Sequence, residues 1–199
     1  MIYVVGIGPG HRDYMLKKGE EVLKKSDYVI GFKRAVESID YLKVNTIIVD
    51  SLKETLDLME SLKGKVSIIA SGDPLFYGIV DYLKKNTEKD INVIPGISSF
   101  QYLSSKIGKC WNGAYLGSMH GRCEEFLLKV KEHKKSFWLT DKKNTPKRLC
   151  EILIEENIKC NLYIGENLSY EDEKIWQGTP LELVKGEYTN LSVIMVEVI

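Results

Sequence analysis

Four loops rich in glycine, proline and small polar residues each follow a predicted strand, and their residue types suit the binding of a ligand. They are GIGPG at 6–10, SGDPLFYG at 71–78, PGISS at 95–99 and LTDKKNTP at 139–146. In an open α/β sheet, the loops at the carboxyl ends of the strands meet at one crevice, where ligands bind. We therefore expect these four loops to line a common binding site.

The first loop resembles part of a dinucleotide-binding turn but lacks its specific parts. The fingerprint G-x-G-x-x-G needs a third glycine where this chain has His11, and Pro9 has no N–H to offer a phosphate. The acidic residue that would hold a ribose hydroxyl after the second strand is replaced by GFKR at 31–34. The turn therefore disfavours a nicotinamide cofactor and, by itself, leaves its ligand open.

The loop at 71–78 has two interpretations. Asp73 and Pro74 could cap the helix that follows, because an acidic N-cap before a first-turn proline is a common helix start. Alternatively, Asp73 could contact a polar part of a ligand.

Charge and composition exclude some classes of protein. The chain has 199 residues, 44% of them apolar, and its 28 basic residues equal its 28 acidic ones. A protein that binds nucleic acid by neutralising phosphates normally has a basic excess, so we expect no nucleic-acid partner. No stretch approaches the roughly 20 apolar residues of a membrane span, and the N-terminus has no basic region ahead of a cleavable apolar segment. These features predict a cytoplasmic protein.

The cysteines do not predict disulfides or a metal site. Cys110, Cys123, Cys150 and Cys160 show no C-x-x-C spacing, so reduced and mostly buried thiols are expected. His120 and Cys123 form H-x-x-C, but nothing nearby supplies the further ligands that zinc requires. We therefore predict no protein-bound metal.

The pattern of apolar residues predicts two α/β domains. Up to residue 108, short β-rich runs alternate with helical periodicity, as at 15–26 and 52–62, which indicates a mostly parallel sheet covered on both faces. After residue 108, strands at 136–140, 160–167, 173–178 and 191–198 have few helices between them, which favours a mixed sheet. Helix starts are predicted at Thr145-Pro146 and, as a capping box, at Thr179 to Glu182. The predicted domains are 1–108 and 109–199, with a cleft between them.

Taken together, GIGPG, SGDPLFYG and VIPGISSFQYLSSKIG (93–108) resemble the core motifs of the tetrapyrrole methylase family, in the family's order. YLGSMHGR (115–122), LTDKKNTPKRL (139–149) and GENLSYEDEKIWQGT (165–179) are similar to the cobalt-precorrin-7 C5-methyltransferase branch. The resemblance implies an enzyme of cobalamin biosynthesis that uses S-adenosyl-L-methionine (SAM) as methyl donor. In this family the glycine turn leaves room for SAM and the tetrapyrrole to approach the backbone.

The resemblance also implies roles for residues at matching positions. Those expected to contact SAM are Pro9, Gly72, Asp73, Phe76, Ser98, Ser99, Leu139, Thr140, Gly165 and Glu166. The substrate is a flat apolar ring edged with carboxylates, so it needs an apolar wall and cations. Residues expected to contact it are Gly8, Tyr77 and Arg122, with Phe76 as further wall and Lys33, Arg34 and Lys142 as further cations that could equally be solvated surface. His120 could act as the general base that removes a ring proton, or serve as a structural histidine.

The family resemblance further implies a homodimer, and possible contact with the C15-methyltransferase of the same pathway is an additional expectation. Two other functions remain open at this point: a related methylase that acts on another ring carbon or on a different substrate, and a SAM-binding scaffold without turnover.

Overall fold

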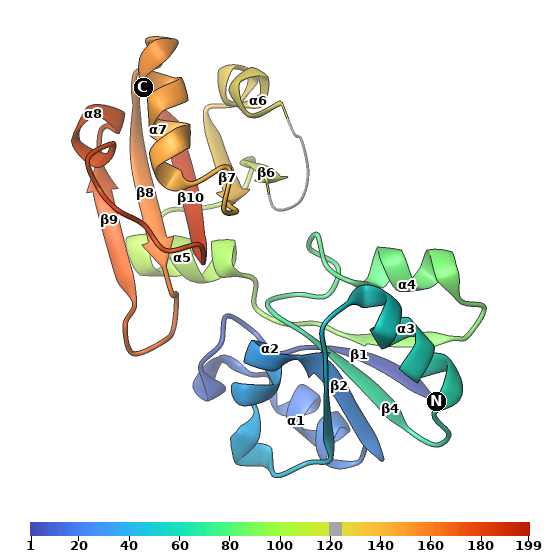
Figure 1. Ribbon diagram of the computed structural model, residues 1–199. Coiled ribbons are helices and arrows are strands. Elements are labelled where there is room, and N and C mark those ends of the chain that lie inside the picture. Colours follow the sequence, from blue (N-terminus) through green and yellow to red (C-terminus); the bar gives the residue numbers. More distant parts are fainter. Residues whose placement is uncertain (120–124) are drawn as a thin grey trace. The chain divides into compact units, whose positions relative to one another are not determined.

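The structure, a computed structural model, describes residues 1–119 and 125–199, which form two compact units, Met1–Ser98 and Ser99–Ile199 (Figure 1). The division precedes helix α5 (Ser99–Ile107), whereas the sequence placed it after residue 108. The reason is that α5 packs against strand β10 (Ser192–Val198) of the second unit. The loop PGISS therefore ends at the junction of the two units.

The first unit contains a five-stranded sheet in the order β3-β2-β4-β1-β5, and all its strand pairs are parallel. Gly6 of β1 is level with Ala70 of β4, and Val5 is level with Ile94 of β5. The adjacent strands β4, β1 and β5 therefore end together. The strands are β1 (Ile2–Gly6), β2 (Tyr28–Phe32), β3 (Thr46–Val49), β4 (Val66–Ala70) and β5 (Ile91–Ile94).

Helices cover both faces of this sheet, as predicted for unbroken apolar strands (Figure 1). Val5 and Ile69 pack with residues of α1 and α2, whereas Val4 and Ile68 pack with residues of α3 and α4 on the opposite face. The helices are α1 (Lys17–Lys24), α2 (Lys33–Glu37), α3 (Leu52–Ser61) and α4 (Val80–Asn86), with short 3-10 turns at Arg12–Tyr14 and Asp40–Leu42.

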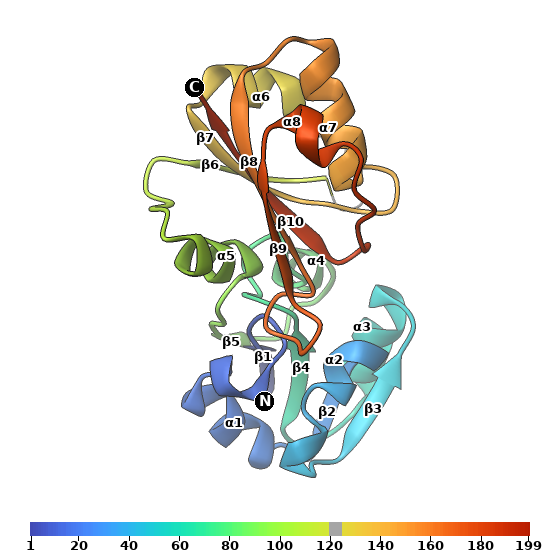
Figure 2. The same ribbon diagram turned by 90° about the vertical axis from the view of Figure 1, so that its left-hand side faces the viewer.

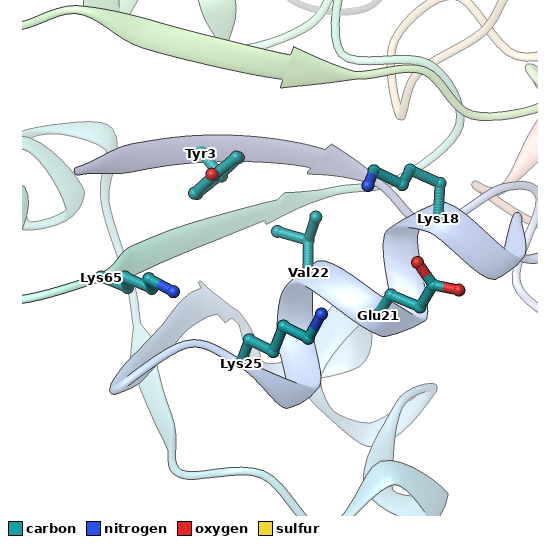
Figure 3. A pocket seen from close by; sticks show the side chains of 6 residues that line it. All are labelled: Tyr3, Lys18, Glu21, Val22, Lys25 and Lys65. Atoms are coloured by element: carbon teal, nitrogen blue, oxygen red, sulfur yellow. The ribbon is translucent and has the colours of Figure 1, made fainter.

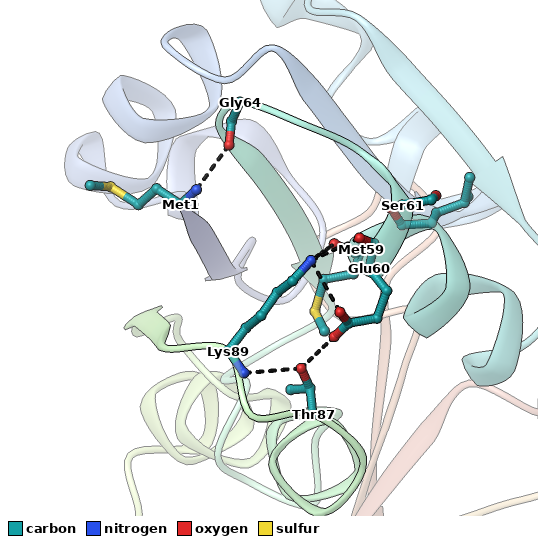
Figure 4. Close-up of polar contacts among 8 residues, drawn as sticks. Met1, Met59, Glu60, Ser61, Gly64, Thr87 and Lys89 are labelled. Carbon is teal, nitrogen blue, oxygen red and sulfur yellow. Dashed lines mark hydrogen bonds and ion pairs between the residues drawn. The ribbon is translucent and has the colours of Figure 1, made fainter.

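A lysine from the segment before β5 donates hydrogen bonds to the last carbonyls of α3 (Figure 4). The Nζ of Lys89 donates to the carbonyls of Met59 and Glu60 at 3.0 and 2.9 Å and lies 3.1 Å from Oε2 of Glu60. The last carbonyls of a helix lack partners within it, so a cation there supplies both hydrogen bonds and favourable charge. Nearby, the amino group of Met1 donates to the carbonyl of Gly64 at 2.9 Å.

The second unit contains a mixed sheet in the order β6-β7-β10-β8-β9, which confirms the prediction (Figure 2). β6 and β7 are parallel, and the other pairs are antiparallel. Helix α6 (Phe126–Glu132), which was not predicted, lies between the two parallel strands in the chain. The strands are β6 (Tyr115–Ser118), β7 (Lys135–Leu139), β8 (Cys160–Glu166), β9 (Lys174–Gly178) and β10.

The helices of the second unit lie on both faces of its sheet. Helices α6, α7 (Pro146–Glu155) and α8 (Pro180–Leu183) share one core with Trp138, whereas α5 covers the other face, where the rings of Phe100 and Phe137 lie 5.8 Å apart. Both predicted helix starts are confirmed: Thr145 accepts from the N–H of Arg148, and Thr179 forms a capping box with Glu182.

The described cysteines are free thiols. Cys150 and Cys160 are buried, and burial raises the pKa of Cys150 to about 12 and that of Cys160 to about 11. Both are therefore protonated at neutral pH. Cys110 is exposed, contrary to the expectation for most cysteines, and Cys123 lies outside the described residues. Among the described residues, no helix has the length and apolar character needed to cross a membrane.

Candidate functional site

Backbone hydrogen bonds join two of the predicted binding loops at the carboxyl edge of the parallel sheet. The N–H of Gly72, after β4, donates to the carbonyl of Gly8, after β1, at 2.8 Å, and the N–H of Gly8 donates back at 3.3 Å. Both glycines have positive φ, +67° and +74°, which other residues adopt only at a cost. The two loops are thus fixed to each other by their main chains.

The third loop, after β5, packs directly on these two. A Cβ added to Gly96 would lie 2.1 Å from the carbonyl oxygen of Gly72 and 2.9 Å from Cα of Gly6. A Cβ on Gly6 would lie 2.6 Å from the nitrogen of Gly96. Glycine is therefore required at Gly6 and Gly96 because the backbones of three loops touch each other there. The room left by their missing side chains is filled by the protein itself.

The carboxylate of Asp73 connects the loop after β4 to the loop after β5. Its Oδ1 accepts from the N–H of Leu75 at 2.8 Å, and its Oδ2 accepts from the N–H of Gly96 at 3.1 Å. The helix-capping interpretation is wrong, because α4 begins only at Val80 with Ile79 at its N-cap position. Asp73 is half-buried.

The remainder of this loop carries the two aromatic residues. The rings of Phe76 and Tyr77 lie 5.1 Å apart in an edge-to-face arrangement, and both residues are half-buried. Tyr77 has φ of +50°, which is unusual for a residue with a side chain. Leu75, in contrast, is 62% exposed.

In the second unit, the residues predicted to contact SAM lie side by side at one end of neighbouring strands of the mixed sheet. Leu139 at the end of β7 pairs with Val193 of β10, which pairs with Gly165 of β8. Thr140 is buried, and its hydroxyl donates to the carbonyl of Ser192 at 2.8 Å. The antiparallel register thus brings together stretches that are far apart in the chain.

Glu166 is a buried carboxylate at the same edge. Its Oε2 accepts from Nε1 of Trp176 at 2.5 Å, and its Oε1 accepts from the N–H of Thr189 at 2.6 Å. Next to it, a Cβ on Gly165 would lie 2.7 Å from a methyl group of Leu168, which is itself buried. Glu166 and Gly165 therefore both serve packing within the second unit.

Comparisons with known proteins agree with this architecture of two α/β units, with its glycine loops and its mixed sheet. Residues 1–184 match the family of tetrapyrrole (corrin/porphyrin) methylases. The chain belongs to this family. A probable cobalt-precorrin-7 C(5)-methyltransferase from Methanocaldococcus jannaschii is 35% identical over 99% of this chain and 98% of that protein.

Solved structures of tetrapyrrole methylases share the fold. The precorrin-6Y methylase of Archaeoglobus fulgidus has a TM-score of 0.79 at 23% identity and covers 100% of this chain and 98% of its own. The uroporphyrin-III C-methyl transferase of Thermus thermophilus, in its complex with S-adenyl homocysteine, has a TM-score of 0.78 at 19% identity and covers 98% and 91%. The predicted family and the fold of two sheets are confirmed.

The structure places the residues predicted by the methylase resemblance in two groups. Gly8, Pro9, Gly72, Asp73, Phe76, Tyr77 and Ser98 lie in loops at the carboxyl edge of the first sheet, and Ser99 begins α5. Leu139, Thr140, Gly165 and Glu166 lie along one edge of the second sheet. That these residues contact SAM or the substrate stays a prediction, and so does the cleft between the domains. His120 and Arg122 lie outside the described residues.

The additional cations predicted for a methylase substrate are exposed. Lys33 and Arg34 begin α2 directly after β2, and Lys33 lies 3.9 Å from the carboxylate of Glu37. Lys142 is in the loop after β7. For metals, residues 1–119 and 125–199 contain no group of three or more His, Cys, Asp or Glu side chains arranged to hold an ion.

A pocket of about 170 Å³ lies between α1 and the strands β1 and β4 of the first sheet (Figure 3). Its lining comes from the start of β1, from α1 and from the residue before β4, namely Tyr3, Lys18, Glu21, Val22, Lys25 and Lys65. None of these lining residues belongs to the predicted SAM loops.

Glu173 organises the loop between β8 and β9, where the sequence predicted no special residue. Its carboxylate accepts from the N–H of Ser169 at 2.7 Å and pairs with Nζ of Lys106, on α5, at 3.0 Å. Ser169 has φ of +72°, so the loop adopts a conformation that needs such support. Burial of Glu173 opposes its ionisation, but hydrogen bonds from Ser169, Lys106 and Tyr102 outweigh burial and hold its pKa below the usual range.

We expect Glu173→Gln to reduce the free energy of unfolding by about 1 kcal/mol at pH 7, since charge-assisted hydrogen bonds are lost. A carboxyl whose pKa is lowered on folding stabilises the folded state above its unfolded pKa, and this contribution disappears as the pH falls through the folded pKa. The difference between the two proteins should therefore shrink below about pH 4.5. Urea titrations from pH 7 to pH 3 measure it, with exposed Glu171→Gln as control. A difference that stays constant over this range contradicts the assignment.

Sequence reasoning missed Gly6, Gly96, Leu168, Glu173 and Trp176 as residues that shape these edges. The motif PGISS did carry a signal for Gly96, because glycine in a loop just beyond a strand permits a close backbone approach. Gly6 and Glu173 have partners far away in the chain, Gly96 and Lys106. Leu168 and Trp176 contact Gly165 and Glu166, which are nearer in sequence, but no local pattern predicts these contacts.

Proposed function

We propose that this chain is a SAM-dependent C-methyltransferase that methylates C5 of cobalt-precorrin-7. The observation that carries the proposal is 35% identity to the Methanocaldococcus protein of that name over nearly the whole length of both chains. The branch-specific stretches at 115–122, 139–149 and 165–179 agree with it.

The first unit offers a fitting place for SAM. Gly72 is half-exposed, and a Cβ on it would make only an ordinary contact, 3.5 Å from Cα of Ser98, so the backbone here is not tightly covered as it is at Gly6 and Gly96. We propose that the loops around Pro9, Gly72 and Ser98 bind SAM, together with the other contact residues that the family resemblance implies.

The proposed reaction requires positioning more than covalent participation. When bound, SAM supplies an activated methyl group: its bond to sulfur breaks as a bond to ring carbon C5 forms, and a ring proton must leave afterwards. Holding the two reacting carbons at near-attack distance can contribute up to about 7–11 kcal/mol to such a displacement. His120 is the proposed acceptor of the proton, and its alternative is a structural role.

Incubation with SAM and cobalt-precorrin-7 tests the function directly. We expect a product heavier by one methyl group, with NMR placing the new carbon at C5, and near one-to-one calorimetric binding of S-adenosylhomocysteine without binding of NAD. Methylation at another carbon would instead support the related-methylase alternative. SAM binding without turnover would support the scaffold alternative, and NAD binding without SAM binding would contradict both.

We expect Arg122→Ala to raise the KM for the tetrapyrrole about tenfold while leaving SAM affinity unchanged, because a guanidinium can pair with a ring carboxylate in a bidentate fork. Arg122→Lys should recover only part of the loss, since an ammonium cannot form the fork. The matched control is Arg148→Ala on α7, where the side chain pairs with Glu151. Loss of SAM binding in Arg122→Ala, or unchanged substrate kinetics, contradicts the assignment.

We further propose that the protein is a cytoplasmic homodimer without a bound metal and that it can contact the C15-methyltransferase of the same pathway. Light scattering at micromolar concentration tests the dimer, and elemental analysis of the purified protein tests for metal. A predominantly monomeric species or a stoichiometric metal contradicts the respective proposal.

A further inference from the structure

We infer that Asp73 is a positioning residue for SAM: its carboxylate holds together the loops that bind the methyl donor. The inference rests on the proposed function, because it concerns the same loops at the carboxyl edge of the first sheet. This positioning role is additional to the direct contact that the family resemblance implies.

Both carboxylate oxygens of Asp73 already have protein partners. Oδ1 accepts from the N–H of Leu75 at 2.8 Å, which closes the turn that follows, and Oδ2 accepts from the N–H of Gly96 at 3.1 Å, which belongs to another loop. Hydrogen bonds to an ionised acceptor are roughly twice as strong as neutral ones. One side chain therefore both shapes its own loop and fixes its neighbour.

The bond to Gly96 reaches the most closely packed point of the edge. The nitrogen of Gly96 lies 2.6 Å from where a Cβ of Gly6 would be, and Gly72, next to Asp73 in the chain, exchanges two backbone hydrogen bonds with Gly8. The loops after β1, β4 and β5 thus meet around this carboxylate. Removing its charge and one of its acceptors should allow the Gly96 peptide to move away from the other two loops.

Movement of this kind has a specific kinetic consequence. If only a fraction of the ligand-free molecules holds the loops in the binding arrangement, the apparent dissociation constant rises by the inverse of that fraction. Once SAM is bound, the arrangement is restored and turnover at saturation is unaffected. A positioning role therefore predicts a higher KM for SAM with an unchanged kcat.

The test compares Asp73→Asn with Asp81→Asn, a change of an exposed aspartate in the first turn of α4. In Asp73→Asn, one oxygen becomes an NH₂ group that cannot accept a hydrogen bond. We expect faster hydrogen exchange of the Gly96 amide in the ligand-free protein, about tenfold weaker binding of S-adenosylhomocysteine and a KM for SAM raised to match, with kcat within about twofold. Asp81→Asn should match the unaltered protein in all four measurements.

Asp73→Ser provides a second variant if Asp73→Asn fails to fold. Its hydroxyl can still close the turn at Leu75 but is too short to replace the second oxygen, so it separates the two bonds. Weaker binding with unchanged exchange at Gly96 would mean that Asp73 acts only through direct contact with SAM and would overturn the inference, as would unchanged binding or a fall in kcat at saturation. If the unaltered protein binds neither SAM nor S-adenosylhomocysteine, the proposed function itself fails. That outcome is distinct, because it appears without any substitution.

Discussion

Gly96→Ala is expected to lower the free energy of unfolding by about 3 kcal/mol, near the upper end of the range for overpacking, and to abolish SAM binding. The added Cβ would lie 2.1 Å from the carbonyl oxygen of Gly72 and 2.9 Å from Cα of Gly6, so the backbone of at least one loop must move. A flexible side chain could yield at little cost, but here the obstructing atoms belong to the main chain.

The measurements are thermal and urea unfolding, together with calorimetry of S-adenosylhomocysteine. Gly113→Asn is the matched control, because no atom lies within 4 Å of its Cβ position and asparagine tolerates the left-handed φ of +73° found there. If Gly96→Ala unfolds like the unaltered protein and binds the ligand normally, the close contact between the three loops is wrong.

Glu166→Ala is expected to reduce the free energy of unfolding by about 2–4 kcal/mol, because two hydrogen-bond donors lose a charged acceptor. These donors are Nε1 of Trp176 on β9 and the N–H of Thr189, before β10. The loss should weaken the packing at the end of the sheet where the carbonyl of Ser192 accepts a hydrogen bond from the hydroxyl of Thr140. The free energy of unfolding of Glu166→Gln should lie between those of the unaltered protein and Glu166→Ala, since its amide keeps one acceptor but turns a donor toward the other partner.

Denaturant unfolding, followed by circular dichroism, measures the stability of Glu166→Ala. Exposed Glu171→Ala, in the neighbouring loop, serves as control and should change stability by less than about 0.5 kcal/mol. A protein with Glu166→Ala that keeps its stability but loses SAM binding would show that Glu166 serves the ligand rather than the fold.

The two carboxylates show where a family motif stops being informative. Asp73 and Glu166 both stand at positions that the methylase resemblance assigns to SAM contact, and both have backbone N–H groups as partners within their own unit. A motif reports that a residue type is needed at a position. It does not distinguish a ligand contact from a contact that holds the ligand-binding loop.

The sequence by itself determined the features that depend on neighbours in the chain. Alternating strands and helices predicted a parallel first sheet, Thr145 and Thr179 marked helix starts, and the loops after the strands carried the family motifs. These predictions succeeded because hydrophobic periodicity and helix capping act over a few residues.

Only the tertiary structure decided which loops touch and through which atoms. Gly6 ends β1 and Gly96 follows the adjacent strand β5, so the two lie far apart in the chain. Their need for glycine follows from a backbone contact that neither local sequence contains. In the same way, Asp73 could have capped a helix, and it bonds to Gly96 instead because parallel pairing ends β1, β4 and β5 at one edge. Strand register sets such contacts, and register depends on the packing of the whole sheet.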